Sequence, residues 1–240
     1  MDAPGPAGLD ELYAHPAPHD GSAWVRANMI VSVDGRTTVE GRSGGLGGDA
    51  DRELLGLLRS LSDVILVGSA TVRAEGYRPA KLRTERRAAR VAAGRPPYPA
   101  IAVVSARLDL DLDADLYADP STIVVTSENS DPTRLSAVRE GCQVLTTPGP
   151  SVDLAGAART LAGLGRPRVL CEGGPRLLAS LVAAAALDEL CLSVSPSLAG
   201  GDGPGLLAGL PPTVRALRLA SSREIAGMLF LRYLTGAREV

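Results

Sequence analysis

Short apolar runs alternate with helical patterns along most of the chain. The runs are rich in Val, Ile, Leu and Ala, and they predict strands buried on both faces, as in a parallel sheet. These strands are expected at residues 24–33, 64–67, 100–104, 122–126, 143–146, 169–171 and 188–195. After residue 205 the pattern changes, and residues 214–221 and 228–234 predict two strands joined by a turn. The sequence therefore predicts an α/β fold, with a mostly parallel central sheet flanked by helices and an antiparallel C-terminal edge.

Residues 168–182 combine a strand, a glycine turn and the start of a helix. Glu172 ends the apolar run, and Gly173 and Gly174 let the backbone turn without Cβ clashes. Pro175 suits the first helical position, because its missing N–H costs nothing there. Such a turn directs free N–H groups and the positive end of the helix dipole at one point, where a phosphate or pyrophosphate fits. It is equally an ordinary tight connection of α/β proteins, and no G-x-G-x-x-G pattern follows the first strand.

Other polar positions lie between the first strands. The loop at 41–48 holds five glycines and Ser43, so a ligand could lie against bare backbone there, or the loop is simply flexible. Ser69 and Thr71 offer hydroxyls at the next strand-to-helix turn, either to a ligand or as helix caps. A helix is expected between the 41–48 loop and the turn at Ser69. Asp49 or Asp51 could cap its N-terminus, and its buried stripe is formed by Leu54, Leu55, Leu58 and Leu61.

Two charged segments are interpreted as surface. Residues 81–95 carry six cations against one acid, which is typical of a solvated helix face, and nothing in their spacing demands a ligand. Residues 109–119 are acidic and predict a loop.

Composition narrows the range of functions. Hydrophobic residues make up 45% of the chain and charged residues 22%, so we expect one globular domain at 23–240 after a poorly ordered lead-in at 1–22. Aromatic residues are only 3% and the net charge is −2, so nucleic-acid binding is not expected. No apolar run approaches the ~20 residues of a membrane span. We therefore predict a cytoplasmic protein without membrane contact.

Neither the cysteines nor the histidines predict a metal site. Cys142, Cys171 and Cys191 lie in apolar runs without C-x-x-C spacing, which predicts buried free thiols in a reducing compartment. His15 and His19 are four residues apart, but the prolines between them disfavour a helix, so they are interpreted as tail residues.

Four segments occur in an order that resembles a known family: SVDGR at 32–36, GSATVRAE at 68–75, EGGP at 172–175 and LDEL at 187–190. Together they resemble the C-terminal reductase domain of the bacterial riboflavin-biosynthesis deaminase/reductase, which has the dihydrofolate reductase-like fold. The resemblance extends from about Trp24 to Tyr233. The zinc signature of the deaminase half, H-x-E followed by P-C-x-x-C, does not occur. The chain therefore looks like a stand-alone reductase of the actinobacterial type.

The resemblance implies an NADPH-dependent oxidoreductase similar to 5-amino-6-(5-phosphoribosylamino)uracil reductase. Such an enzyme reduces a ribosylaminopyrimidine 5′-phosphate to the ribitylamino compound in riboflavin biosynthesis, by hydride transfer to the ribose C1′. By resemblance, Ser43, Arg59 and Glu172 bind the substrate, and Glu172 is the catalytic-site residue that orients it. The resemblance also implies cofactor-binding positions at Gly45, Thr71, Glu75, Gly173, Gly174, Pro175, Arg176, Leu177 and Leu178. The family's habit and the strand edge at 228–234 favour a homodimer.

Two other functions stay open. Dihydrofolate, or another pterin or pyrimidine, could be the substrate, because a shared fold does not fix the substrate. Residues 75–80 depart from the family pattern, so a phosphate-binding cation could come from Arg78, Lys81 or Arg83. The second alternative is a non-catalytic NADPH-binding module. The two intact glycine segments argue against it.

Overall fold

The computed structural model describes residues 7–16 and 22–236. Nine strands in this part of the chain form one sheet, in the order β5-β4-β3-β2-β6-β1-β7-β9-β8. Neighbours from β5 to β7 are parallel, whereas β9 pairs antiparallel with β7 and β8. The predicted parallel sheet with an antiparallel C-terminal edge is therefore confirmed. In chain order the strands are β1 (Trp24–Ser32), β2 (Val64–Gly68), β3 (Ala100–Val104), β4 (Ile123–Ser127), β5 (Gln143–Thr147), β6 (Arg168–Cys171), β7 (Glu189–Ser195), β8 (Leu217–Ile225) and β9 (Met228–Thr235).

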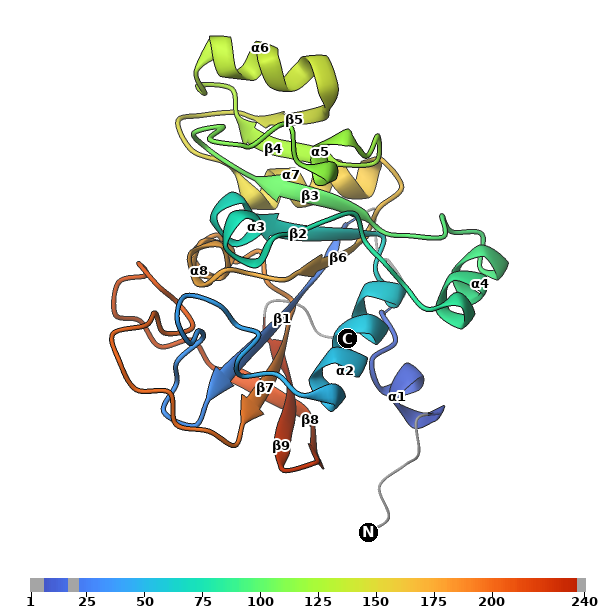
Figure 1. Cartoon of the computed structure of the whole chain (residues 1–240), viewed down its shortest axis with the longest axis vertical. Coiled ribbons are helices and arrows are strands. Elements are labelled where there is room, and N and C mark those ends of the chain that lie inside the picture. The colour runs from blue at the N-terminus through green and yellow to red at the C-terminus, as the bar shows by residue number, and fades with distance from the viewer. Residues whose placement is uncertain (1–6, 17–21, 237–240) are drawn as a thin grey trace.

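Helices cover both faces of the sheet, which runs along the molecule from β5 and α6 at one end to the β8–β9 hairpin at the other (Figure 1). The helices α7 and α8 pack on one face, whereas α2, α3, α5 and α6 pack on the other. Among the described residues, no helix is long and apolar enough to cross a membrane. In chain order the helices are α1 (Ala7–Leu12), α2 (Asp49–Leu61), α3 (Ser69–Glu75), α4 (Thr84–Ala92), α5 (Asp115–Ala118), α6 (Pro132–Gly141), α7 (Leu154–Gly163) and α8 (Pro175–Ala183).

The strand β2 shows why the apolar runs are continuous. Val64 and Leu66 point into the cluster under α7 and α8, while Ile65 and Val67 point into the cluster under α3 and α5. Successive side chains of a strand face opposite sides of the sheet, so a strand covered on both sides needs an apolar residue at every position.

Two helices differ from the sequence prediction. Neither predicted aspartate caps α2, whose N-cap is Gly48 without a side-chain hydrogen bond. Its buried leucines are Leu54, Leu57 and Leu58, because the sheet contacts a face of the helix slightly rotated from the predicted stripe. The acidic segment predicted to be a loop contains α5, where Leu116 and Tyr117 are buried between the acids.

The three cysteines are free thiols, as predicted. Cys171 and Cys191 are buried in β6 and β7, and burial raises the pKa of Cys171 to about 12. Cys142 is only partly buried. In the part of the chain that the structure describes, no group of three or more His, Cys, Asp and Glu side chains is placed to hold a metal ion.

The N-terminal segment is more ordered than predicted. Residues 7–16 contain α1, and Tyr13 after it is only 2% exposed, packed in the cluster that holds Leu58 and Phe230. Burial, assisted by nearby arginines such as Arg26, lowers the pKa of His15 to about 2. One aromatic anchor, Tyr13, therefore fixes residues 7–16 of the predicted lead-in to the core, and the predicted domain boundary at residue 23 stays a prediction. His19 and the other residues at 1–6 and 17–21 lie outside the described residues.

The basic segment is also more than a solvated face. Arg90 on α4 is 1% exposed, and its guanidinium donates to the carbonyl oxygens of Ser60 (2.9 Å), Ser62 and Pro96 (2.8 Å). Burial lowers the pKa of Arg90 to about 10. The side chain therefore fastens α4 to the C-terminal end of α2, because that end presents carbonyls without intrahelical partners.

A buried carboxylate joins the strands where the sheet changes from parallel to antiparallel. Glu189 of β7 accepts hydrogen bonds from Trp24 (2.9 Å) and Arg26 (3.0 Å) of β1, and from Arg232 (2.6 Å) of β9. Both Glu189 and Arg26 have no exposed side-chain surface. Burial alone would raise the pKa of Glu189, but Arg26 and Arg232 lower it overall. Part of the LDEL segment therefore holds the sheet together rather than forming the cleft described below.

We expect Glu189→Ala to lower the free energy of unfolding by about 3–5 kcal/mol, because it leaves buried guanidinium groups without their counter-charge. Asp49→Ala is the matched control, since Asp49 pairs with Arg52 on the surface with its side chain 99% exposed. That loss is expected to stay below ~0.5 kcal/mol. Urea unfolding of both variants measures the difference, and equal losses would contradict a structural role for the buried cluster.

Candidate active site

A cleft of about 330 Å³ lies at the carboxyl ends of β1 and β6. Open α/β sheets commonly bind ligands at this edge, where loops and helix N-termini converge. The predicted site residues on its wall are Ser43, Thr71, Glu75, Glu172, Gly174 and Pro175. The remaining predicted residues lie beside or behind this wall: Gly45, Arg59, Gly173, Arg176, Leu177 and Leu178.

The turn between β6 and α8 has no room for side chains. Gly173 has a φ of +86°, in the region that favours glycine, and a Cβ there would lie 2.9 Å from Met29 Sδ. A Cβ on Gly174 would lie 2.7 Å from Thr71 Oγ1. The peptide bond between the two glycines is cis, and the Gly173 carbonyl accepts a hydrogen bond from Gly68 N at 2.9 Å. The close approach of β1 on one side and α3 on the other explains both glycines.

Glu172 is held by two neighbours. Arg59 on α2 binds it through two hydrogen bonds, Nε to Oε1 at 2.7 Å and Nη2 to Oε2 at 2.6 Å. The Tyr77 hydroxyl donates to Oε2 at 2.7 Å. Burial alone would lower the pKa of Arg59, but the Glu172 carboxylate raises it. Burial, and then Glu172, raise the pKa of Tyr77 well above its ordinary value.

Arg59 therefore stands behind Glu172 rather than on the cleft wall. Its side chain is 23% exposed and Glu172's only 4%, and its guanidinium also lies over the Tyr77 ring at 5.8 Å. The sequence predicted two separate substrate contacts, and the structure joins them as an ion pair. Arg59 is placed to position Glu172, and its own contact with a substrate stays a prediction.

Two further predicted residues also bind each other. Glu75 Oε1 accepts hydrogen bonds from Ser43 N at 2.7 Å and from Ser43 Oγ at 2.9 Å. These bonds fasten the 41–48 loop to the C-terminal end of α3 at the wall of the cleft. The direct role of Glu75 in the fold is to hold this loop, and its cofactor contact stays a prediction.

The start of α8 can receive an anion. Its N-cap, Gly174, provides no side-chain hydrogen bond, and Pro175 occupies the first turn. The N–H groups of Leu177 and Leu178 both donate to Gly174 O, at 2.9 and 3.1 Å. The sequence therefore overcounted the free donors, because the first turn of the helix already uses these two. The N–H of Arg176 is the predicted donor that these bonds leave for a ligand.

A dinucleotide pyrophosphate fits this corner of the cleft. The glycine backbone permits close approach, the nine-residue helix α8 points its N-terminus there, and the Thr71 hydroxyl lies next to Gly174. Ala70, Thr71, Gly174 and Pro175 line the same stretch of wall.

Five polar residues on the cleft wall were not predicted as site residues: Asn28, Thr37, Thr38, Asp51 and Tyr77. Asn28 is the one amide in an otherwise apolar part of β1, a signal that could have been noticed. Asp51, a candidate cap by sequence, lines the cleft instead, and its Oδ1 is buried. Tyr77 follows α3 and lies far from Glu172 in the sequence, so no helix or strand periodicity could have predicted that the two side chains meet.

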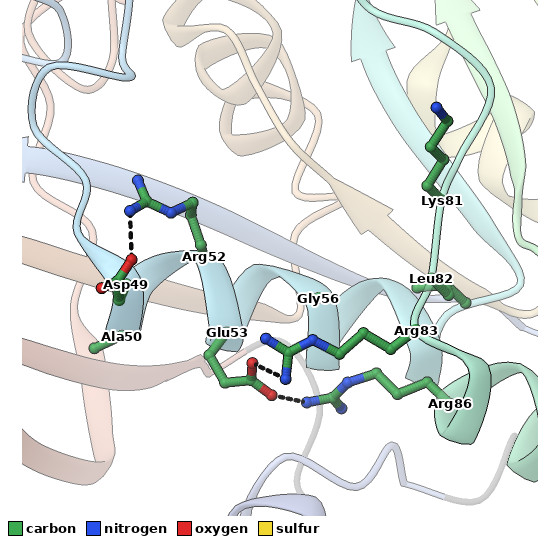
Figure 2. Close-up of a pocket in the computed structure, with 9 residues that line it drawn as sticks. All are labelled: Asp49, Ala50, Arg52, Glu53, Gly56, Lys81, Leu82, Arg83 and Arg86. Atoms are coloured by element: carbon green, nitrogen blue, oxygen red, sulfur yellow. Dashed lines mark hydrogen bonds and ion pairs between the residues drawn. The ribbon is translucent and has the colours of Figure 1, made fainter.

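A second hollow of about 520 Å³ lies on the other side of α2 and contains two of the predicted phosphate-binding candidates, Lys81 and Arg83 (Figure 2). Arg83 and Arg86 converge there on Glu53, at 2.8 and 2.5 Å, whereas Lys81 stands apart. From α2, residues 49, 52, 53 and 56 line this second hollow, whereas residues 51 and 55 line the cleft that contains Glu172. Lys81 and Arg83 therefore belong to a different surface from Glu172.

The fold and cleft define an α/β protein of the dihydrofolate reductase-like class. Dihydrofolate reductase from Enterococcus faecalis superimposes with a TM-score of 0.51 over 89% of this chain and 96% of its own, and is 13% identical. At that identity the likeness shows the fold alone. The sequence profile of the RibD C-terminal domain matches residues 23–231, and the chain belongs to this family.

Relatives of known name agree with this membership. The 2,5-diamino-6-ribosylamino-4(3H)-pyrimidinone 5′-phosphate reductase of Archaeoglobus fulgidus is 29% identical over 78% of this chain and 86% of its own length. The protein of the same name from Methanothermobacter thermautotrophicus is 27% identical over 84% of this chain and 92% of its own length. A pyrimidine reductase-like protein from Corynebacterium diphtheriae superimposes with a TM-score of 0.81 at 26% identity, over 90% of this chain and 93% of that one.

We expect Gly173→Ala to destabilise the protein by about 1–3 kcal/mol, because the added Cβ meets Met29 Sδ and the backbone keeps a positive φ. Gly56→Ala is the control, since Gly56 lies inside α2 with open space around its Cβ position. It should stabilise by about 0.5–1 kcal/mol through helix propensity. Urea unfolding measures both, and a neutral Gly173→Ala would show that the turn can relax.

Proposed function

We propose that this chain is an NADPH-dependent reductase that converts a ribosylaminopyrimidine 5′-phosphate to the ribitylamino compound in riboflavin biosynthesis. The observation that carries the proposal is the meeting of Glu172, Thr71 and the glycine turn on one cleft, in a member of the RibD C-terminal domain family. The names of the archaeal relatives support this substrate class. The actinobacterial type and the cytoplasmic location stay predictions.

In this proposal the start of α8 holds the NADPH pyrophosphate. Arg176 N–H donates to it, Thr71 offers a hydroxyl, and the glycine backbone leaves space beside it. The bound cofactor supplies the hydride that is added to the ribose C1′. The preference for NADPH over NADH is proposed from the resemblance to the family.

Glu172 is suited to orienting the substrate. A carboxylate has about four lone-pair positions. Arg59 takes one on each oxygen and Tyr77 takes a second on Oε2, so Oε1 keeps a free acceptor position. A pyrimidine N–H or a ribose hydroxyl can use that position. Because two rigid partners fix the carboxylate, a donor bound to it is held in one orientation, which is the main contribution a protein makes to hydride transfer.

The first test is NADPH oxidation, followed by absorbance, with the ribosylaminopyrimidine phosphate in one assay and dihydrofolate in the other. We expect turnover of the pyrimidine alone, because the relatives act on that class. Turnover of dihydrofolate alone would overturn the substrate and keep the reductase. Binding of NADPH without turnover of either compound would favour the non-catalytic module.

We expect Glu172→Gln to lower kcat/KM about 10- to 100-fold, since a hydrogen bond to a charged group is worth roughly 1.5–3 kcal/mol. The amide would also point an N–H group at Arg59 or Tyr77. Glu140→Gln, on the exposed face of α6, is the matched control and should leave both constants unchanged. Full turnover with an unchanged KM in Glu172→Gln would refute the assigned role.

We also propose a homodimer formed through the edge of the sheet. The segment predicted as the edge, 228–234, belongs to β9, which lies between β7 and β8. The edge strand is β8, whose Leu217, Leu219 and Ile225 are 41%, 50% and 38% exposed. An apolar edge with unpaired backbone groups favours pairing with a second copy. Leu219→Lys should shift the mass measured by light scattering from dimer to monomer. Leu164→Lys, at an exposed leucine after α7, should leave it unchanged. A monomeric unmodified protein would contradict the proposal.

A further inference from the structure

Three carboxyl side chains of the described residues line the cleft, and they have different partners: Asp51, Glu75 and Glu172. Glu172 accepts hydrogen bonds from a guanidinium and a phenol, and Glu75 accepts a backbone N–H and a hydroxyl. Asp51 Oδ1 is buried and accepts no hydrogen bond from the described part of the chain. Of the three acids, Asp51 is the one with a buried oxygen that accepts no hydrogen bond from the described residues, although the Ser193 hydroxyl interacts with its carboxyl group.

The position of Asp51 is fixed by regular structure. It lies in the first turn of the 13-residue helix α2, on the side that faces the cleft together with Leu55. The fully buried Ser193 hydroxyl of β7 interacts with the Asp51 carboxyl, and Asn28 of β1 lines the same cleft. Asn28 Oδ1 is also buried without a hydrogen-bond partner among the described residues. The cleft wall therefore contains two polar side chains, each with a buried oxygen that accepts no hydrogen bond from the described residues.

This setting favours the protonated form of Asp51. Burial raises the pKa of its carboxyl, and the Ser193 hydroxyl and Arg52 oppose that shift only in part. The neighbouring charged and titratable groups are Arg52 on its own helix and Glu75, Tyr77 and Glu172 on the other walls of the cleft. From β1 and β7, Asn28 and Ser193 are neutral, whereas the charged Arg26 and Glu189 of these strands bind each other. Asp51 consequently keeps its proton to a higher pH than an ordinary aspartate.

We propose that Asp51 is a catalytic residue that gives the proton needed when the substrate is reduced. The proposal rests on the proposed function. Hydride adds to C1′ of the ring-opened C=N bond, and the π electron pair moves to the nitrogen. The nitrogen takes the proton of the Asp51 carboxyl, and the carboxylate regains a proton from solvent. The reduced nicotinamide is oxidised, the imine becomes an amine, and no other reactant is required.

The division of work between the acids follows from their partners. Glu172 has one acceptor position left and therefore orients a donor of the substrate. Asp51 offers an O–H that no acceptor of the described chain competes for at Oδ1. A general acid needs a pKa near the working pH, and burial without a paired cation is the usual way to obtain it.

The central experiment compares Asp51→Asn with Asp49→Asn. Both lie in the first turn of α2, but the Asp49 side chain is 99% exposed. Asparagine keeps the shape of a neutral aspartic acid, so the fold should survive, and NADPH titration should give an unchanged dissociation constant. We expect kcat of Asp51→Asn to fall about 10²- to 10⁴-fold, the usual contribution of a general acid. Asp49→Asn should match the unmodified enzyme.

The pH profile separates proton donation from a structural role. In the unmodified enzyme kcat should fall as pH rises through the Asp51 pKa, since the protonated form is required. The residual rate of Asp51→Asn should lack that limb. Carbon-13 NMR titration of the side-chain carboxyls gives a readout without turnover. The Asp51 signal, assigned by its loss in the variant, should titrate at a higher pH than an ordinary aspartate carboxyl.

Each outcome decides between the two proposals. An unmodified enzyme that reduces the pyrimidine, with Asp51→Asn equally active and equally pH-dependent, would refute the proton donor and keep the proposed function. An Asp51 signal that titrates at the pH of an ordinary aspartate would refute it as well. An unmodified enzyme that binds NADPH but does not reduce the pyrimidine would remove the proposed function, and the proton donor with it.

Discussion

The tight packing around the glycine turn after β6 is the constraint on which the site depends. Met29 of β1 and Thr71 of α3 press on the turn from two sides, so neither Gly173 nor Gly174 has space for a Cβ. The turn brings the N-terminus of α8 next to the Thr71 hydroxyl and sets Glu172 at the end of β6, facing Arg59 and Tyr77. A turn with more space would move the N-terminus of α8, where an anion could bind, away from the Glu172 carboxylate. The proposed pyrophosphate site and the proposed substrate site at Glu172 therefore both depend on the tight packing of this turn.

The polar side chains at the amino ends of the parallel strands differ in role from those at the carboxyl ends. At the amino ends of the strands, ion pairs bind neighbouring elements: Glu189 joins β1, β7 and β9, and Asp63 before β2 holds Arg168 at the start of β6 at 2.9 Å. At the carboxyl ends, the side chains line a cleft. The seven neighbouring strands from β5 to β7 in the sheet are parallel, so the stabilising polar groups lie at one end of the strands and the ligand-facing ones at the other.

Within the cleft, the partner of each acid decides what the acid can do. A carboxylate that accepts a bidentate arginine is fixed and has few acceptor positions left, whereas a partly buried one beside a hydroxyl retains its proton more readily. Glu172 and Asp51 illustrate the two cases in one cleft. Identical functional groups thus acquire different roles from burial and charge alone.

The sequence by itself determined the strands, most of the helices, the mostly parallel sheet and the glycine turn. These features depend on local periodicity and on glycine and proline positions, which are visible in a single chain. The order of the EGGP, GSATVRAE and SVDGR segments also indicated the family. The tertiary structure decided the partners: Arg59 with Glu172, Ser43 with Glu75, Arg90 with the end of α2, and Asp51 with the cleft rather than with its own helix cap. Partners that are far apart in the sequence produce no periodic pattern in it, because they come together only when the strands pair and the helices pack on the sheet.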